Sequence, residues 1–570
     1  MVLKQVPTYA SRLLCAFFCA NFLTMLAMNA GRVYTHWLPF LYFLALAAVS
    51  FPVFNGNLIP PVHADHLPMQ KQRQLTILAL VAACFLACVR LPYLMEGLFH
   101  HAIGPIVYDD TWHFQEINSL VHSVRYPAQC SLIQNRYFSL YYAPWMLIAA
   151  LYLAIPVKGF TIKAAFAIGC AIYQLLICLT LLYIGFMRAR SLRQLYWAIY
   201  ITACWAGLES IFSLMYYLQR NPQWLLESGM PIQLPIFFSG IVWAPHHMTA
   251  AIALLLCWHI WDMALKKSWR VVGCCSILIA YTFYSSVFVF LGALPLGLYV
   301  AAMAVQRYQR PVLAIACLSS ALIWPLLWIY LGKSHDVRFM IPFIQNAKGL
   351  FPFMTEEHFH WLFHHSAFTT AVVNGTIVGF FVFLLFICLN FGLHLFSLVH
   401  YSEKLDRSSI ALVAIAGAFI VSTYFIGFPE GDNYASRGYI VPIIVLGWIC
   451  AGLLPPIRAR SWAALGLFLG AFGLIHEGFQ TYKHALYIAQ TPLSVPYGQE
   501  ILRINQDRHT GAASSAAISK MLHDDPGLIY YIDRFVEGGK INLVVGDRQL
   551  ECAGPNGPWR WQRIPGISSK

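Results

Sequence analysis

Two adjacent carboxylates, Asp109 and Asp110, follow an apolar stretch in a chain that is otherwise poor in charge, and His113 comes shortly after them. On a helix, His113 would lie one turn from both acids, because residues three and four apart share a helix face. One carboxylate could then act as a general base while the other orients it or holds a cation. Asp110 also suits the N-cap of a helix that begins at Thr111. Because Asp110 has this competing role, Asp109 is the preferred base.

A pair of histidines, His246 and His247, follows Pro245 near the end of an apolar run. Proline is expected to open the helix there and to free a carbonyl. Imidazoles in this position could bind a phosphate or a metal ion, or shuttle a proton. No carboxylate neighbours them in the sequence, so the pattern for a metal site is weak. Histidines of an interfacial aromatic belt are the plainer interpretation.

Cationic side chains in later polar loops are candidate ligands for a phosphate group. Arg437 begins an apolar run, where an unpaired cation would be costly, and a phosphate would pair with its guanidinium in a bidentate manner. The loop before it contains Asn433 and two acids, so an internal salt bridge is an equal alternative. Arg338 and Lys348, in a separate polar stretch, are further phosphate candidates.

The composition indicates a polytopic membrane protein. Of the 570 residues, 59% are hydrophobic and 11% are charged, whereas a soluble domain carries about 25% charged residues. The net charge of +13 comes from basic residues clustered in short connections between apolar runs, which indicates orientation in a membrane and no nucleic-acid partner. Nearly all of the 15 cysteines lie in apolar runs, where Cys acts as a small hydrophobe. Only Cys130 and Cys552 fall in predicted outer segments, where they could pair.

Apolar runs of about 20 residues, the length that crosses a bilayer, predict about 13 transmembrane helices. They fall at 13–31, 37–57, 74–94, 160–187, 194–218, 237–262, 271–287, 288–305, 312–331, 371–398, 409–427, 438–454 and 461–478. With the short basic connections on the cytoplasmic side, the N-terminus lies inside and the C-terminus outside. The apolar stretch 138–157 then does not cross fully, and is expected to be a re-entrant or surface helix. The alternative is that it spans and a neighbouring pair of runs is merged.

The predicted fold class is an all-α polytopic membrane protein with a small extracytoplasmic C-terminal α/β segment. Its membrane domain covers 1–478 and includes a large outer loop at 95–159, and the C-terminal segment covers 479–570. Residues 541–545 predict a strand and residues 512–523 a short helix. This topology places the acids and His113 at the outer face of the membrane.

Nucleotide-binding signatures are missing from the sequence, which contains neither a GxxxxGK[ST] loop nor a GxGxxG motif after a strand. A transferase with its acids outside therefore most naturally uses a lipid-linked donor. The stretch Tyr108-Asp109-Asp110-Thr111-Trp112-His113, in the first large outer loop, resembles the acidic motif of the GT-C superfamily of membrane glycosyltransferases. The stretch from Asp432 to Arg437 resembles their late polar motif, and the loop as a whole looks like that of bacterial members of uncharacterised type.

The resemblance implies transfer of a sugar from a polyprenyl-phosphate-linked donor to an envelope glycan, lipid or protein acceptor, at the outer face of the inner (cytoplasmic) membrane. It implies Asp109 or Asp110 as the base, and cations that stabilise charge on the departing phosphate. A divalent cation held by the two acids and one histidine stays open. The substrate-binding candidates are Tyr108, Trp112, His246, His247, Arg338, Lys348, Asn433 and Arg437. Two spans precede the span that leads into the acidic loop, which departs from the commonest family pattern and leaves the sugar undetermined.

Two other functions fit parts of the sequence. A transporter or flippase for a lipid-linked substrate would place charges in mid-span and often contains internal repeats. The predicted spans hold only scattered acids, chiefly Glu209 and Asp262, and no repeat is evident. A polymerase or ligase acting on lipid-linked saccharides would depend on arginines of the outer loops and be indifferent to the acid pair.

Overall fold

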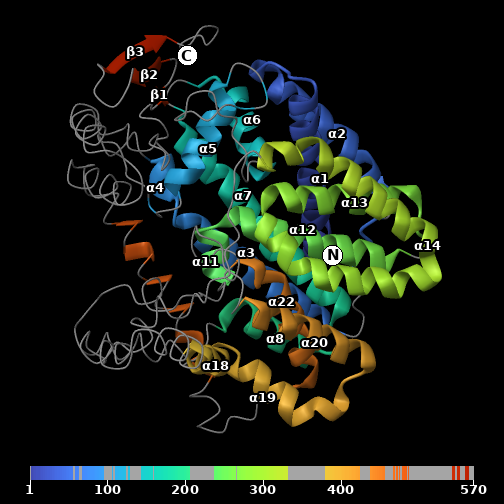
Figure 1. Cartoon of the computed structure of the whole chain (residues 1–570). Coiled ribbons are helices and arrows are strands. Elements are labelled where there is room, and N and C mark those ends of the chain that lie inside the picture. The colour runs from blue at the N-terminus through green and yellow to red at the C-terminus, as the bar shows by residue number, and fades with distance from the viewer. Residues whose placement is uncertain are drawn as a thin grey trace, which may run out of the picture.

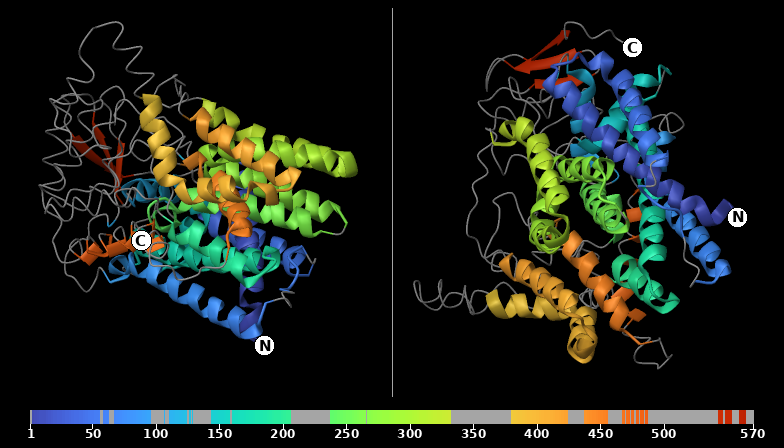
Figure 2. Two further views of the ribbon diagram at one scale, coloured as in Figure 1. Left: turned by 90° about the horizontal axis from the view of Figure 1, so that it is seen from below. Right: turned by 90° about the vertical axis from the view of Figure 1, so that its right-hand side faces the viewer.

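The computed structural model of the chain shows a bundle of helices (Figure 1). It describes residues 2–205, 237–331, 379–423 and 437–455, together with parts of 467–486 and 542–563. Within the first two ranges, residues 56–57, 63–66, 96–105, 107–109, 124–125, 127, 129–142, 158–159 and 265 are not among those described. Described helices α18 to α20 lie on the opposite side of the bundle from α1 and α2 (Figures 1 and 2).

The described helices follow the predicted apolar runs closely. They are α1 (Val2–Ala30), α2 (Leu38–Asn55), α3 (Met69–Cys88), α4 (Leu91–Leu94), α5 (Asp110–His122), α6 (Met146–Ala154), α7 (Ile162–Arg188), α8 (Leu192–Ile199), α11 (Phe237–Val242), α12 (Pro245–Met263), α13 (Trp269–Ser285), α14 (Val287–Leu331), α18 (Gly379–Asn390), α19 (Gly392–Tyr401), α20 (Arg407–Ser422) and α22 (Ile440–Leu453). α14 covers two predicted runs, because the backbone leaves the helical conformation at Tyr308 (φ −133°, ψ 46°).

Several of these helices could cross a membrane. Within the described residues, five helical segments are long and apolar enough: Gln5–Ala30, Thr35–Asn55, Met69–Cys88, Ile162–Arg188 and Val287–Trp324. The prediction of an all-α membrane architecture is therefore confirmed at this level. The count of about 13 spans, and the side of the membrane on which each connection lies, remain predictions.

Four of the six basic connections predicted to share one side of the membrane lie close together at one end of the bundle. Arg188, at the end of α7, lies 3.2 Å from Asp262 near the end of α12. Lys267, in the next connection, places its ammonium 5.2 Å from the ring of Tyr308, where α14 bends. Asp406, before α20, lies within the electrostatic influence of Arg190. These contacts gather connections that are far apart in the sequence, as the orientation rule requires.

Residues 143–154 form a turn and a short helix in the bundle. The turn Ala143–Trp145 leads into α6, whose 9 residues measure about 14 Å along the helix axis, which is short of the ~30 Å apolar core of a bilayer. Asn21 and Tyr173 hold the segment. The hydroxyl of Tyr173 donates to the backbone carbonyl of Pro144 at 2.8 Å, and the side-chain oxygen of Asn21 accepts from the N–H of Leu147 at 3.1 Å. The first half of the segment is buried. That the stretch 138–157 does not cross fully stays a prediction.

α3 ends earlier than the predicted run at 74–94. The helix stops at Cys88, and α4 begins after a turn at Val89 and Arg90. Pro92 explains the break, because proline has no N–H for the next helical hydrogen bond and is accommodated in the first turn of a new helix. The turn and α4 therefore place Arg90 and Tyr93 beyond the apolar helix, although the sequence predicted both within a span.

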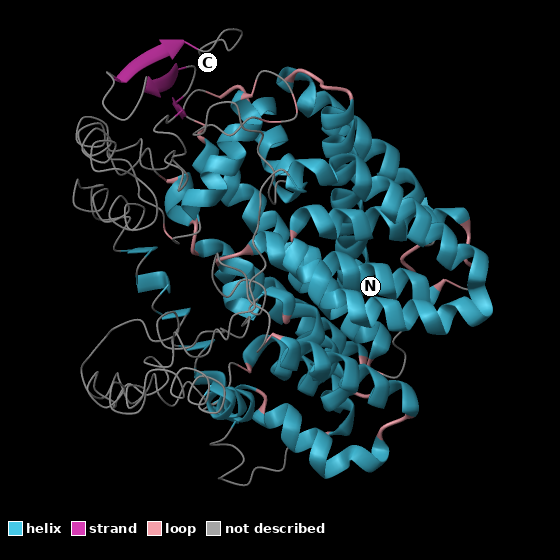
Figure 3. Ribbon diagram, in the orientation of Figure 1, coloured by secondary structure: helices cyan, strands magenta, loops and turns pink. Residues whose placement is uncertain are grey.

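Beyond residue 541, the described part of the C-terminal segment is a small antiparallel sheet (Figure 3). Its strands are β1 (Asn542–Val545), β2 (Arg548–Cys552) and β3 (Trp559–Arg563), in the order β1-β2-β3, with Val545 opposite Arg548 and Cys552 opposite Trp559. β1 matches the strand predicted at 541–545. The helix predicted at 512–523 and Cys130 lie outside the described residues, so the α/β segment as a whole and the pairing of Cys130 with Cys552 stay predictions.

Candidate functional site

A buried ion pair joins the turn after α3 to the start of α5. Nη2 of Arg90 lies 2.5 Å from Oδ1 of Asp110 and also donates to the carbonyl of Val242, at the end of α11, at 2.5 Å. Tyr93 donates its hydroxyl hydrogen to the other carboxylate oxygen at 2.9 Å, and its own oxygen accepts from the N–H of Ile106 at 2.6 Å. Both oxygens of Asp110 are thus engaged by side chains from another element. Asp110 fixes the position of the chain here and is poorly placed to take a proton.

The electrostatics of this pair favour charged partners. Burial alone would lower the pKa of Arg90, but the carboxylate of Asp110 raises it above its usual value. The guanidinium also lies over the ring of Phe166 on α7, with Cζ 4.9 Å from the ring centroid, a contact that is stronger away from water. Pairing the two buried charges offsets part of their desolvation, which costs several kcal/mol per ion. Nε and Nη1 of Arg90 have no hydrogen-bond partner among the described residues.

His113 faces Glu116, on the same helix. Nδ1 of His113 lies 3.3 Å from Oε2 of Glu116, and Nε2 lies 3.3 Å from the carbonyl oxygen of Trp243. Trp145 donates its indole N–H to the same oxygen of Glu116, and its ring centroid is 4.7 Å from that of His113. Asp110 is held by Arg90, and the carboxylate that contacts His113 among the described residues is that of Glu116, one turn further along α5.

Burial keeps His113 neutral. Burial is the largest cause that lowers the pKa of His113 to about 3, the charges of Arg90 and Arg437 act in the same direction, and the carbonyl of Trp243 opposes them in part. α5 is not among the membrane-spanning candidates of the described part. A neutral imidazole has a single N–H, and both neighbours of His113 are oxygen acceptors, so it can donate to only one of them at a time. This makes the His113–Glu116 pair sensitive to the arrival of a further hydrogen-bonding group.

His246 lies against this pair from another helix. Pro245 is the first residue of α12, and the predicted run 237–262 is interrupted between Val242 and Pro245, as expected from the proline. The carbonyls of Val242 and Trp243 are free there to face Arg90 and His113. The ring of His246 lies 5.0 Å from that of His113 and 5.8 Å from that of Trp145, centroid to centroid. Glu116 is connected to His246 through His113 and Trp145, which both contact its carboxylate.

His247 reaches the connection between α13 and α14. Its Nδ1 lies 2.7 Å from Oγ of Ser286. Ser286 in turn accepts from the N–H of Val289 at 3.2 Å, as a residue at the start of α14 does. Since the serine oxygen already accepts from the backbone, its hydroxyl hydrogen is available to His247. The rings of His246 and His247 are in contact, tilted by 46° with centroids 3.9 Å apart, so the two histidines join α13 and α14 to the site.

Arg437 approaches the same site from the start of the segment that becomes α22. The side chain is half-buried, and its charge acts on His113. No carboxylate among the described residues forms an ion pair with Arg437. The salt bridge considered as an alternative involves Glu430 and Asp432, which lie outside the described residues.

The remaining predicted residues divide into two groups. The side chain of Trp112 is not described, although its backbone lies in α5. The others lie outside the described residues: Tyr108, Asp109, Arg338, Lys348 and Asn433.

A divalent cation does not fit Asp110 in this arrangement. Its two oxygens face a guanidinium and a phenol, and a metal ion there would stand against the positive charge of Arg90. The potential ligand atoms that do converge within the described part of the chain belong to Cys15, Cys19 and Cys274, between α1 and α13. They form no part of the site around Asp110.

Four residues of the site were missed by sequence reasoning: Arg90, Tyr93, Glu116 and Trp145. Arg90 carried a usable signal, because a lone arginine within a predicted span indicates a functional or paired position. Glu116 follows His113 at helical spacing. We considered this spacing for Asp109 and Asp110, which precede His113, but not for Glu116. Tyr93 and Trp145 had no comparable signal, since aromatic residues are frequent throughout this chain.

Comparison with known proteins gives no relative on which a function could be based. No protein-family model matches the chain, and neither a curated protein nor a solved structure matches it. The interpretation of the site therefore depends on its own geometry and chemistry.

Proposed function

We propose that the chain is a membrane glycosyltransferase of the GT-C type, which transfers a sugar from a polyprenyl-phosphate-linked donor to an envelope glycan, lipid or protein acceptor at the outer face of the cytoplasmic membrane. One observation carries the proposal. The buried ion pair with Arg90 holds Asp110, the sequence neighbour of Asp109, in place. Asp110 lies at the end of the bundle that contains His113, His246 and Arg437, away from the basic connections.

Asp109 is the proposed general base. Adjacent Cα atoms are about 3.8 Å apart, so anchoring Asp110 also confines Asp109 to this end of the bundle. The base takes the proton of the acceptor hydroxyl as its oxygen bonds to the anomeric carbon. The bond between that carbon and the donor phosphate oxygen breaks, and the electron pair leaves with polyprenyl phosphate. Direct displacement of this kind inverts the anomeric centre.

Arg437 is the proposed partner of the departing phosphate. It is half-buried and has no ion-pair partner among the described carboxylates, whereas Arg90 is neutralised by Asp110. A cation held in position before the reaction stabilises charge that develops in the transition state. Neutral His113 adds hydrogen-bonding capacity without competing with Arg437 for the phosphate.

The lipid tail of the donor requires an apolar surface beside the site. α3 leads directly into the turn that holds Arg90, and its outward side chains Leu78, Val81 and Phe85 are each more than half exposed. An apolar stripe on a spanning helix faces lipid. A prenyl chain lying along this stripe would bring its phosphate to the end of α3.

The test uses membrane vesicles that contain the full chain and a panel of synthetic polyprenyl-phosphate monosaccharides, with release of polyprenyl phosphate as the readout. We expect Asp109→Asn to slow release by roughly 10²–10⁴-fold, the usual contribution of a general base. Asp406→Asn is the matched control, because Asp406 is exposed at the basic end and asparagine preserves its role as the N-cap of α20.

Other outcomes distinguish the alternatives. Full activity in both Asp109→Asn and Asp110→Asn would rule out an acidic base and the proposal with it. Movement of the lipid-linked sugar across the vesicle membrane without release of polyprenyl phosphate would indicate a flippase. Release that depends on Arg437 and not on Asp109 would indicate a polymerase or ligase.

A further inference from the structure

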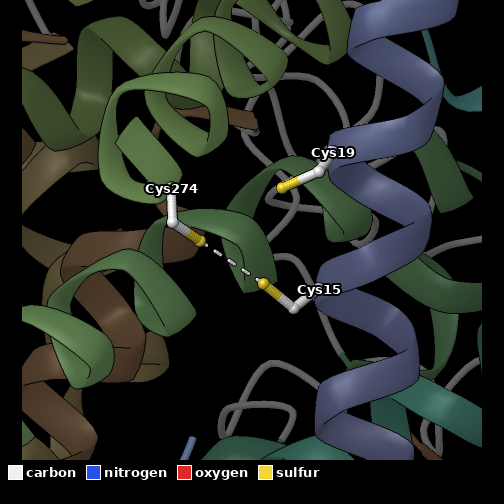
Figure 4. Close-up of side chains that lie close together, drawn as sticks. All are labelled: Cys15, Cys19 and Cys274. Carbon is white, nitrogen blue, oxygen red and sulfur yellow. Dashed lines mark hydrogen bonds between the residues drawn. The ribbon is translucent and has the colours of Figure 1, made fainter. Parts of the chain in front are cut away.

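Three cysteine side chains converge inside the bundle, away from the proposed transferase site. Cys15 and Cys19 belong to α1 and Cys274 belongs to α13, and all three are buried. Their sulfur atoms all lie within 4.8 Å of one another, and Sγ of Cys15 is 3.6 Å from Sγ of Cys274. Figure 4 shows the three side chains directed into one gap between the two helices.

A second cysteine pair shows a different arrangement. Cys257 on α12 donates its thiol hydrogen to the carbonyl of Cys275 at 3.8 Å, and Cys275 donates to the carbonyl of Cys257 at 3.6 Å. These thiols satisfy themselves on backbone oxygens, as small buried side chains commonly do. In the first cluster, by contrast, the sulfurs of Cys15 and Cys274 face each other.

The helices around the cluster hold it in a defined geometry. Cys15 and Cys19 are one turn apart and therefore lie on one face of α1. One turn along the interface, the rings of Phe18 on α1 and Tyr281 on α13 stack with centroids 4.6 Å apart. This packing fixes the distance between the helices, so the third sulfur meets the other two without rearrangement of the backbone.

We propose that Cys15, Cys19 and Cys274 bind a soft monovalent cation, Cu(I). Thiolate ligands select soft metals such as Cu(I) and zinc. Structural zinc takes four ligands in a tetrahedron, whereas the cluster in the described residues offers three ligand atoms. One thiolate neutralises a monovalent ion, whereas zinc needs two. A monovalent ion therefore places fewer charges in this buried site, where each charge costs free energy because it is removed from water.

Binding couples metal uptake to the packing of α1 on α13. Each thiol that ligates as a thiolate releases its proton to the medium as the Cu–S bond forms, and no electron is transferred. Because Cys15 and Cys274 are 259 residues apart in the chain, the ligand set exists only in the folded bundle. A bound ion therefore stabilises the folded state relative to the unfolded state.

The experiment titrates the full chain, purified in detergent under anaerobic reducing conditions, with Cu(I) in competition with a chromogenic Cu(I) chelator. We expect one Cu(I) per chain, a shell of sulfur ligands in X-ray absorption, and a higher unfolding temperature with copper than with chelator alone. Cys15→Ser, Cys19→Ser and Cys274→Ser should each weaken binding beyond the roughly 10–100-fold that loss of a mere supporting contact to a metal ligand costs. Cys257→Ser should bind as the unchanged protein does.

Several results would overturn the proposal. They are a nitrogen or oxygen shell in X-ray absorption, binding that survives in the serine variants of the cluster, and equal losses in Cys257→Ser. Zinc that competes successfully with Cu(I) for the same three thiols would overturn the choice of ion. The X-ray absorption measurement uses the unchanged chain, so it decides the ligand type even where a serine variant fails to fold. None of these measurements depends on release of polyprenyl phosphate, so the copper site and the transferase are tested independently.

Discussion

Two pairs of arginine and aspartate, at opposite ends of the helical bundle, show how burial changes the role of the same chemistry. In the pair Arg90–Asp110 the side chains are 1% and 0% exposed and their atoms approach to 2.5 Å. In the pair Arg188–Asp262 they are 24% and 58% exposed and 3.2 Å apart. Each pair joins segments from different helices, so topology alone does not distinguish them.

The surroundings of the two pairs differ in a way that follows from the cost of desolvation. Each member of the buried pair has a further hydrogen-bond partner: Arg90 donates to the carbonyl of Val242, and Asp110 accepts from Tyr93. A buried charge needs such hydrogen bonds to replace its lost water. Arg188 rests on the ring of Trp258, 5.3 Å from its centroid, and remains open to water. A buried pair permits few geometries and can therefore position a catalytic segment, whereas an exposed pair tolerates many.

The largest effect is expected from removing one partner of the buried pair. Arg90→Met leaves the Asp110 carboxylate buried without its counter-charge, and the free energy of unfolding should fall by about 3–5 kcal/mol. The unfolding temperature of the full chain in detergent would measure the loss. The double variant Arg90→Met/Asp110→Leu should recover much of that stability but no transferase activity. Equal stability of Arg90→Met and the unchanged chain would show that the pair does not constrain α5.

A smaller effect is expected from the pH dependence of His113. Its pKa is about 3 in the folded protein against an ordinary value of 6.5, so below pH 6.5 the unfolded chain takes up a proton that the folded chain does not. The free energy of unfolding should therefore decrease as pH falls from 6.5 toward 3, by about 2 kcal/mol at pH 5 from this residue, and be unaffected by it above pH 7.

The matched comparison for His113 is a histidine on the surface. His113→Gln should flatten the decrease in stability between pH 6.5 and 5, as measured by thermal unfolding in buffered detergent. His400→Gln, at an exposed position on α19, should leave the decrease unchanged. The same slope in His113→Gln and in the unchanged chain would contradict the assignment to His113.

The helices of the bundle could be predicted from the sequence because apolar length is a property of each segment by itself. α7 and α13 match their predicted runs to within two residues at each end. The end of α3 was wrong because hydropathy does not register what Pro92 does to the backbone. The segment that contains α6 was predicted not to cross the membrane, because all basic connections must lie on one side and this limits the number of spans. That constraint is a property of the whole chain, and the prediction stands as one.

The site was less predictable, because its contacts join residues that are distant in sequence. Spacing on α5 correctly indicated that Asp110 and His113 share a face, but it could not show that Arg90 would occupy Asp110 first. The carbonyls of Val242 and Trp243, which receive Arg90 and His113, are backbone groups. Pro245 indicated that a carbonyl would be free there, but not which side chains would reach it. The convergence of Arg437 with His113 likewise depends on how α22 packs.

The smallest effect is expected at the exposed pair. A double-mutant cycle of Arg188→Gln and Asp262→Asn should give a coupling free energy between about 0 and 1 kcal/mol, because water and salt screen charges at such a site. Raising the salt concentration from 0.15 M to 1 M shortens the screening length from about 8 Å to about 3 Å, so this coupling should shrink further. The coupling of Arg90 with Asp110, measured in the same way, should change little with salt, since ions do not reach it. A salt-resistant coupling at Arg188–Asp262 as large as that at Arg90–Asp110 would mean that burial does not cause the difference between the two pairs. Burial would then give no physical reason for the Arg90–Asp110 pair to position Asp109.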